Sequence, residues 1–292
     1  MAIHRHILCN GEIREASEAC LRPGQVGLLS GWGVFSTFRV MNGALFAWER
    51  HWARMTRDAR LLNVPMPAEG GQVYEDILGL LAANQAGTRS TVRLVVVRNG
   101  GGLWEGPGSG FASDTIALTA DMKQWSESVR LGIQPDGRYA ASDFTRAKML
   151  SWAENLRWAE RAQENGFDEV VLLNERGQVT ECTSANLFAV FGSEVATAPA
   201  SDGCLPGITR EVLLEEIRLP GVNVVEHSLS LEDLYRADEV FITSSTRDLL
   251  PVREIAGRQI RTAGTVRERL SAAFQKYVLE DVTRRQPAFA VR

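Results

Sequence analysis

Lysine is scarce in this sequence of 292 residues, and Lys123, Lys148 and Lys276 are the only three. A reaction that needs a nucleophilic side-chain amine therefore has three candidates. The four cysteines, at positions 9, 20, 182 and 204, lie far apart and lack the spacing of metal ligands. Because a chain of this length does not need disulfides for stability, we interpret them as reduced thiols and expect no metal site.

Long apolar runs and basic blocks are also missing. No stretch approaches the roughly 20 apolar residues that cross a bilayer, so a membrane-embedded protein is excluded. The net charge of −4, without a block of basic residues, argues against a nucleic-acid partner. The first six residues lack the apolar stretch of a secretory signal, and we expect a cytoplasmic location. The remaining composition, 45% hydrophobic and 23% charged, is typical of a globular protein with two domains.

The first part of the sequence predicts hairpins followed by helices. Asn10-Gly11 and Asn42-Gly43 each separate apolar runs, and this dipeptide favours the tight turn of a β-hairpin. Helical spacing of apolar residues predicts helices over 49–62 and 72–84. Residues 91–98 and 115–119 are predicted strands, and the glycine-rich stretch 99–113 is a predicted loop. We place a domain boundary near 120–127, which gives an N-terminal domain over 1–120 and a C-terminal domain over 121–292.

The second part mixes strands and helices. Strands are predicted over 128–134, 169–173, 178–181, 186–191, 195–197, 223–226 and 239–243, and helices over 209–217, 231–235 and 264–280. Met149, Trp152, Leu156, Ala159 and Ala162 form an apolar stripe that ends at Gly166, which predicts that Lys148 lies at the start of a helix. Mostly antiparallel or mixed strands in both halves favour two α/β or α+β domains over strict βαβ alternation.

Three features indicate chemistry, and each has a simpler alternative. Residues 203–210 place a glycine turn and the Thr209 hydroxyl at a helix start, where free N–H groups bind phosphate. Spacing alone is more typical of an ordinary helix cap at Thr209. Lys148 beside apolar residues would lose its proton readily and attack an aldehyde, whereas a solvated lysine is the commoner situation. Glu181, within a strand, needs a cationic partner such as a protonated pyridine nitrogen unless it is an exposed edge residue.

The order of these features along the chain resembles class IV aminotransferases. The resemblance is carried by Lys148 and by residues 166–169, 181–188 and 205–210, and it continues in residues 31–39, 50–55 and 237–252. This family includes branched-chain aminotransferases, D-amino-acid aminotransferases and aminodeoxychorismate lyases, and it uses pyridoxal 5′-phosphate. The resemblance implies the two-domain α+β or α/β fold of the D-amino-acid aminotransferase-like enzymes, with the cofactor between the domains. It also implies a homodimer.

The resemblance further implies roles for individual residues. Lys148 would attach the cofactor as a Schiff base and then move the substrate proton, and Glu181 would pair with the ring nitrogen. The other implied cofactor-binding residues are Arg54, Trp152, Asn186, Leu205, Gly207, Ile208, Thr209 and Ser245. The implied substrate-binding residues are Trp32, Phe35, Arg39, Arg93, Arg98 and Thr246.

Departures from the family pattern bear on the substrate. Trp152 stands where branched-chain aminotransferases have a tyrosine, and an indole donates a hydrogen bond but cannot accept one. Thr91 replaces an aromatic residue of the carboxylate-binding strand, and the arginine–histidine trap of the D-amino-acid enzymes is missing after Arg98. We predict a transaminase acting between an amino acid, small or branched, and the keto acid 2-oxoglutarate. An aminodeoxychorismate lyase, a D-amino-acid transaminase and a binding protein with an inactive form of the fold are the alternatives.

Overall fold

The computed structural model describes residues 2–18, 24–102, 110–262 and 264–285. Residues 103–109, the middle of the predicted glycine-rich loop, therefore lie outside the described residues. The chain forms two compact units. The first consists of Met1–Lys123, Ala147–Trp152 and Val278–Arg292, and the second of Gln124–Arg146 and Ala153–Tyr277. The chain thus passes from one unit to the other after residues 123, 146, 152 and 277.

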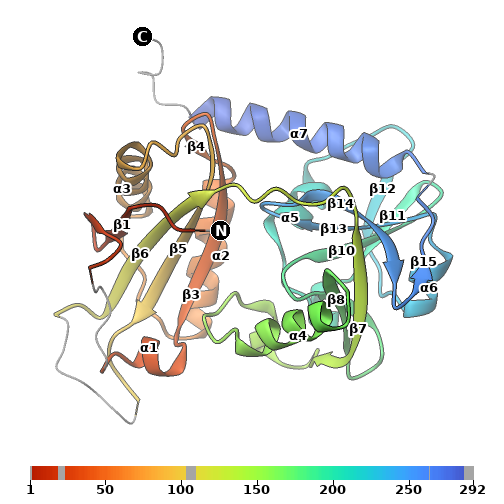
Figure 1. Ribbon diagram of the computed structural model, residues 1–292, viewed down its shortest axis with the longest axis horizontal. Helices are drawn as coiled ribbons and strands as arrows, with labels where there is room; N and C mark the ends of the chain where they lie inside the picture. Colours follow the sequence, from red (N-terminus) through yellow and green to blue (C-terminus); the bar gives the residue numbers. More distant parts are fainter. Residues whose placement is uncertain (1, 19–23, 103–109, 263, 286–292) are drawn as a thin grey trace. The chain divides into compact units, whose positions relative to one another are not determined.

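A six-stranded antiparallel sheet organises the first unit (Figure 1). Its order is β2-β1-β6-β5-β3-β4, and the strands are β1 (His6–Cys9), β2 (Glu12–Glu15), β3 (Gly33–Met41), β4 (Ala44–Leu45), β5 (Arg89–Arg98) and β6 (Ser113–Asp121). Asn10 and Asn42 have φ angles of 51° and 50°, and Gly11 and Gly43 follow at 83° and 80°. Positive φ at both central positions is what a tight hairpin turn requires, so both predicted hairpins are confirmed.

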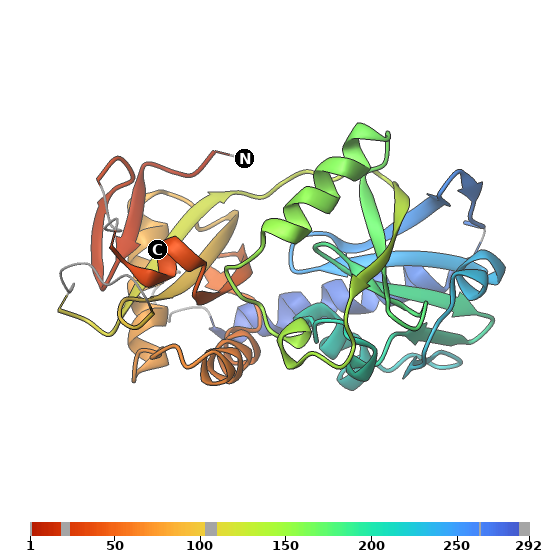
Figure 2. The ribbon, with the colours of Figure 1, turned by 90° about the horizontal axis from the view of Figure 1, so that it is seen from below.

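Helices α2 (Trp48–Leu61) and α3 (Gly70–Ala83) cover one face of this sheet, and a short helix α1 (Val26–Ser30) precedes β3 (Figures 1 and 2). Both predicted helices are confirmed within two residues. Val34 and Phe38 of β3 and Leu94 of β5 pack against Met55 of α2 and Ile77 of α3. Because side chains alternate along a strand, neighbouring residues of β3 and β5 lie on the opposite face. That face carries Phe35, Arg39 and Arg93.

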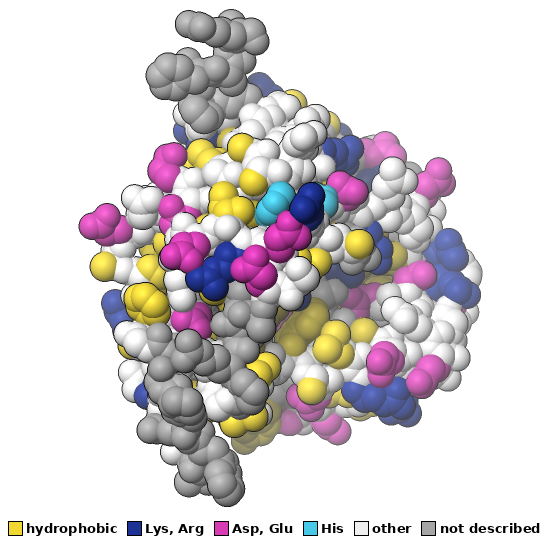
Figure 3. All heavy atoms as spheres, turned by 60° about the vertical axis from the view of Figure 1, so that its left-hand side comes forward, with side chains coloured by type: hydrophobic (Ala, Val, Ile, Leu, Met, Phe, Trp, Pro, Cys, Tyr) yellow, Lys and Arg dark blue, Asp and Glu magenta, His cyan; other side chains and the backbone are white. Residues whose placement is uncertain are grey.

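Charged side chains protect the β2 edge of this sheet. Arg5 and Glu15 form an ion pair of 2.6 Å, and Arg14 pairs with Glu12 on β2 itself. Figure 3 shows this side of the first unit, where acidic and basic side chains lie next to one another. Charges on an edge strand oppose pairing with a strand of another molecule. The β2 edge is therefore disfavoured as a site of edge-to-edge aggregation.

A mixed nine-stranded sheet organises the second unit. Its strands are β7 (Val129–Arg138), β8 (Glu169–Asn174), β9 (Val179–Cys182), β10 (Asn186–Phe191), β11 (Glu194–Thr197), β12 (Asn223–Glu226), β13 (Glu239–Ser244), β14 (Asp248–Ile255) and β15 (Arg258–Gln259). The order is β12-β11-β10-β13-β14-β7-β8-β9, with β15 beside β14. Strand β7 runs parallel to β14 and β8, and β11 runs parallel to β12. The predicted strands are confirmed, whereas β14 and β15 were not predicted.

Four helices accompany this sheet or continue beyond it. They are α4 (Ala153–Glu164), α5 (Ile208–Glu215), α6 (Leu231–Arg236) and α7 (Val266–Arg285), together with 3-10 turns at Asp143–Arg146 and Ala200–Asp202. The last three helices agree with the prediction. Among the described residues, no helix has the length and apolar character needed to cross a membrane. The same part of the chain contains no cluster of three or more residues suited to hold a metal ion.

The predicted helix start at Lys148 is wrong. Helix α4 begins only at Ala153, and the segment before it is extended, with Met149 bridged to Val34 of β3. Leu156 of the predicted apolar stripe is 54% exposed, while Asn155 and Ala162 are the buried residues of α4. Apolar spacing of three to four residues was misleading here because pairing with a strand from a distant part of the sequence decides the local conformation.

Candidate active site

Lys148 is fixed through its own backbone in the first unit. Its N–H donates to Asp58 Oδ2 over 2.9 Å, and its carbonyl accepts from the N–H of Phe35 over 3.0 Å. The side chain then places Nζ 4.7 Å from the centre of the Phe35 ring and 5.7 Å from that of Trp152. Phe35 is buried and meets Trp152 edge to face at 5.9 Å. The amine therefore lies against an aromatic surface on an anchored backbone.

Helix α2 contributes a row of buried polar residues to the same unit. His51, Arg54 and Asp58 recur at helical spacing and are all buried. Asp58 also accepts from Arg57 Nη2 over 2.7 Å. Arg54 was expected from the family resemblance, whereas Asp58 and His51 were not predicted as site residues. Their signal was polar residues three to four positions apart on a helix whose other residues on that face are apolar.

A hydroxyl joins this row to β3. The Ser36 oxygen lies 2.7 Å from His51 Nδ1 and accepts from Arg54 Nη2 over 2.8 Å. Burial, followed by the charges of Arg54 and Lys148, lowers the pKa of His51 well below its ordinary value of 6.5. The imidazole is therefore neutral at neutral pH. The charges of Arg54 and Lys148 make the surroundings of His51 positive, and a positive environment suits a phosphate dianion.

The predicted substrate residues of the first unit fall into two groups. Arg93 places its guanidinium carbon 4.6 Å from the centre of the Phe35 ring, so it contacts the same ring as Lys148. Arg39 lies buried on this face of β3. Trp32 and Arg98 instead stack on each other at 4.3 Å. Trp32 donates to the carbonyl of Leu62 over 2.7 Å, and Arg98 donates to the carbonyl of Asn63 over 2.6 Å. Both side chains are therefore bound to the residues that directly follow α2.

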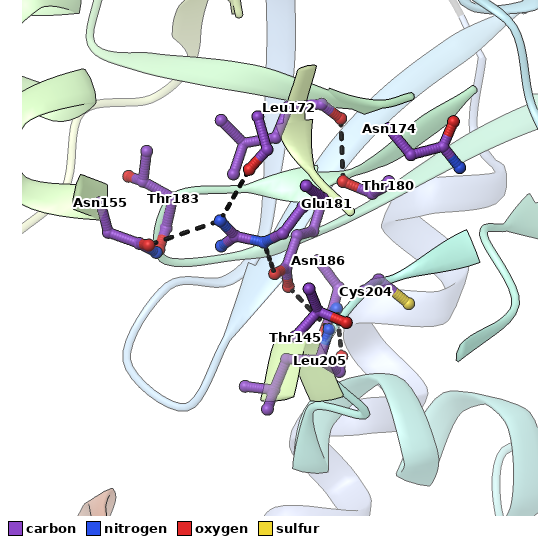
Figure 4. A network of polar contacts seen from close by, with 12 residues as sticks. Thr145, Asn155, Leu172, Asn174, Thr180, Glu181, Thr183, Asn186, Cys204 and Leu205 are labelled. Carbon is purple, nitrogen blue, oxygen red and sulfur yellow. Dashed lines mark hydrogen bonds and ion pairs between the residues drawn. The ribbon is translucent and has the colours of Figure 1, made fainter. Parts of the chain in front are cut away.

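Glu181 of β9 has two hydrogen-bond donors within the second unit (Figure 4). Oε1 accepts from Arg138 Nε over 3.0 Å, and Oε2 accepts from the N–H of Leu205 over 3.1 Å. Both side chains of the ion pair are buried, with 6% of Glu181 and 10% of Arg138 exposed. A buried carboxylate was expected to need a cation, and the chain itself supplies one. Arg138 was missed because nothing in the sequence links positions so far apart.

The start of α5 leaves backbone donors available. Gly207 occupies the N-cap position, and no side chain caps the helix. The first N–H groups of a helix have no partner within the helix, so those of Ile208 and Thr209 are available to an anion. The buried Thr209 hydroxyl has no hydrogen-bond partner among the described residues. An uncapped helix end beside an unsatisfied hydroxyl fits a phosphate group.

Close packing explains the glycine at this helix start. A Cβ on Gly207 would lie 2.1 Å from Asn186 Oδ1, far inside van der Waals contact. Asn186 in turn donates through Nδ2 to the carbonyl of Leu205 over 2.7 Å. The structure thus brings together Glu181, Asn186, Leu205 and Gly207, four residues to which the family resemblance assigns cofactor contacts.

The end of β13 and the loop after it add further polar groups. The hydroxyls of Thr243 and Ser244 are buried and have no partner within the described part of the chain. Ser245 follows directly, and the carbonyl of Thr246 accepts from Trp125 Nε1 over 3.0 Å. Arg247 lies over the Trp125 ring at 4.0 Å. Hydroxyls of this kind, together with the α5 start and the Glu181 carboxylate of the same unit, fit a phosphorylated pyridine cofactor.

Comparison with known proteins establishes the family. Residues 33–255 match the family model of class IV amino-transferases. A putative branched-chain-amino-acid aminotransferase from Methanocaldococcus jannaschii is 30% identical over 92% of this chain and 95% of its own. The D-alanine aminotransferase of Bacillus licheniformis is 28% identical over 95% and 99%. The branched-chain aminotransferase structure from Escherichia coli has the same fold, with a TM-score of 0.85 at 24% identity over 98% and 97%.

The chain therefore belongs to the class IV aminotransferase family. It is an aminotransferase whose cofactor is pyridoxal 5′-phosphate, which this family uses. The predicted family, fold class and cofactor are confirmed.

Proposed function

We propose that this enzyme moves an amino group between a branched-chain L-amino acid and 2-oxoglutarate. The observation that carries the proposal is the Phe35 ring, which Lys148 Nζ and Arg93 both contact, at 4.7 and 4.6 Å. The aromatic surface of Phe35 and Trp152 favours an apolar substrate side chain. The Arg93 guanidinium can pair with the second carboxylate of 2-oxoglutarate or glutamate. One surface thus suits both members of the substrate pair.

Lys148 is the proposed catalytic residue. Bound pyridoxal phosphate withdraws electrons from the substrate Cα and so acidifies the proton there. Lys148 attaches the cofactor covalently, accepts the Cα proton at Nζ after the substrate displaces it, and returns a proton later in the reaction. The hydrogen bonds that its backbone makes with Asp58 and Phe35 fix the position from which the amine acts.

The proposed binding roles follow the remaining polar groups. Arg54 and the N–H groups at the start of α5 hold the phosphate, with Thr209 and Ser245 as hydroxyl donors. Glu181 accepts a hydrogen bond from the ring nitrogen, and Leu205 packs on the ring. Thr246 binds the substrate carboxylate through its backbone. The proposed supporting residues are Trp152, Asn186, Gly207 and Ile208 for the cofactor, and Trp32, Arg39 and Arg98 for the substrate.

A visible absorption spectrum tests the proposal. Protein reconstituted with pyridoxal phosphate should show the yellow band of the attached cofactor, and L-leucine alone should convert it to the pyridoxamine form. The Lys148→Ala variant should fold and bind the cofactor but show neither the band nor turnover. Appreciable turnover in this variant would disprove the assignment of Lys148.

A D-amino-acid transaminase is the second candidate, because a D-alanine aminotransferase is among the relatives. Conversion by D-alanine but not by L-leucine would establish it. A lyase would release its product without accumulating the pyridoxamine form. A cytoplasmic homodimer is the proposed state of the enzyme. Sedimentation analysis of the purified protein tests the dimer, and cell fractionation tests the location.

A further inference from the structure

The arginine that pairs with Glu181 is held by several elements of the second unit. Arg138 ends β7, where it pairs with Asn174 of β8. Its Nη1 donates to the carbonyl of Gly137 over 3.0 Å and lies 3.4 Å from Asn155 Oδ1 of α4. Asn155 itself donates to the carbonyl of Thr183 over 2.6 Å. Figure 4 shows Asn155, Thr183 and Glu181 gathered in this network. The guanidinium thus has a fixed orientation toward Glu181.

We propose that Arg138 is a positioning residue that keeps Glu181 ionised and correctly oriented for the ring nitrogen of the cofactor. The inference rests on the proposed role of Glu181. A carboxylate removed from water is stable as an anion only when a cation or several donors compensate it. Arginine is suited to this because its guanidinium stays charged at all physiological pH values. One Glu181 oxygen bonds to Arg138 and the other to a backbone N–H, which fixes the plane of the carboxylate.

Two buried thiols near Glu181 add no competing negative charge. Burial raises the pKa of Cys204 to about 12, and the negative charge of Glu181 adds to the effect. Burial also raises the pKa of Cys182 well above 9.0. Both thiols are therefore neutral at neutral pH. Arg210, which lies near Cys204, is itself paired with Glu226. Among the ion pairs of the described residues, Arg138 is thus the cation that contacts Glu181 directly.

Loss of Arg138 should weaken the electron-withdrawing power of the cofactor through Glu181. Without the guanidinium, the buried carboxyl retains its proton to a higher pH. A neutral carboxylic acid no longer favours the protonated ring that acidifies the substrate Cα. We therefore expect Arg138→Met to slow the half-reaction with the amino-acid substrate by about tenfold or more, since one pKa unit corresponds to a factor of ten. Arg138→Lys keeps the charge and should recover most of the rate.

A double-mutant cycle separates positioning from a structural role. The variants are Arg138→Met, Glu181→Gln and the pair combined, with single-turnover rates of cofactor conversion as the measurement. If Arg138 acts through Glu181, the combined variant is no slower than Glu181→Gln alone. If Arg138 only stabilises the local fold, Arg138→Met slows both backgrounds equally and the proposal is overturned. Arg176→Met is the matched control, because Arg176 pairs with the buried Asp202 at 3.0 Å elsewhere in this unit.

Unfolding of the cofactor-free protein provides an independent measurement. In Arg138→Met, Glu181 must lose its proton in a buried site without its partner, so its pKa in the folded state rises above that in the unfolded state. The stability of this variant relative to wild type should therefore fall as pH rises from about 4 to 8. Glu181→Gln in the same background should remove the pH-dependent loss. A pH profile parallel to that of wild type would overturn the proposal.

The two measurements also distinguish this inference from the proposed function. An unchanged half-reaction rate in Glu181→Gln would refute the proposed role of Glu181, and with it the positioning role of Arg138. A slow Glu181→Gln beside a fast Arg138→Met would refute only the latter. If Arg138→Met fails to fold by itself but folds together with Glu181→Gln, that rescue supports the charge pairing. If neither Arg138→Met nor its combination with Glu181→Gln folds, and Arg138→Lys reacts as slowly as Glu181→Gln, the inference is wrong.

Discussion

Replacement of Asp58 by alanine should loosen the backbone that carries Lys148. The carboxylate, of which only 2% is exposed, accepts from the N–H of Lys148 over 2.9 Å. A hydrogen bond to a charged group contributes about 1.5–3 kcal/mol, and its loss leaves a backbone donor unsatisfied. The ion pair with Arg57 adds at most about 1 kcal/mol, because the arginine is 53% exposed. Asp58→Ala should therefore lower the free energy of unfolding by about 2–4 kcal/mol.

Urea denaturation of the cofactor-free protein measures this loss, and the rate at which the visible cofactor band appears measures how well Lys148 is positioned. Arg57→Ala is the matched control, because it removes the ion pair but keeps the bond from Lys148 to Asp58. It should cost no more than about 1 kcal/mol. Asp58→Asn retains an acceptor oxygen, and its loss of unfolding free energy should lie between those of Asp58→Ala and Arg57→Ala. If Asp58→Ala matches Arg57→Ala in both stability and band formation, Asp58 does not anchor the lysine.

Three further predictions concern other buried groups. Because folding lowers the pKa of His51, the stability of the wild type should fall as pH drops below 6.5, and His51→Gln should reduce that fall. Urea midpoints measured at about pH 8 and pH 5.5 test this, and an equal shift in wild type and variant would contradict it. Gly207→Ala should weaken pyridoxal phosphate binding by about tenfold or more, because the added Cβ clashes with Asn186. Gly71→Ala, where an added Cβ would meet no atom within 4 Å, should leave binding unchanged. Direct titration of both variants with the cofactor compares them. Asp281 accepts a hydrogen bond over 2.8 Å from the backbone N–H of Ala47, at the start of α2. Asp281→Ala should therefore lower the free energy of urea unfolding by about 2 kcal/mol, and a loss below about 0.5 kcal/mol would contradict a stabilising role of this bond.

Local rules were sufficient where the conformation depends on adjacent residues. The Asn10-Gly11 and Asn42-Gly43 turns were predictable because their positive φ angles are intrinsic to these residues. Apolar periodicity located α2 and α3 in the same way. The glycine turn before α5 also followed from the local sequence, although the contact that excludes a Cβ at Gly207 comes from the Asn186 side chain on β10.

Long-range partners explain what could not be predicted. Lys148 is extended because its hydrogen-bond partner Phe35 comes from a strand more than one hundred positions earlier. Strand β14 was missed because it contains Pro251, and proline argues against a strand within a sheet. In the structure Pro251 nevertheless lies opposite Phe241 of β13, and β14 also pairs with β7. The ion pair of Arg138 with Glu181 joins residues on different strands. The family resemblance indicated a set of site residues, but the groups that hold them became visible only in the fold.

The path of the chain has a consequence for engineering this enzyme. The segment Ala147–Trp152 belongs to the first unit, yet the residues on both sides of it belong to the second. A chimera made by joining a relative's sequence to this one after Lys123 would therefore combine β3 of one parent with the lysine segment of the other. The bonds of Lys148 to Phe35 and Asp58 would then depend on a match that neither parent was selected for. Recombination of class IV enzymes to change specificity should exchange residues 147–152 and 278–292 together with the N-terminal part.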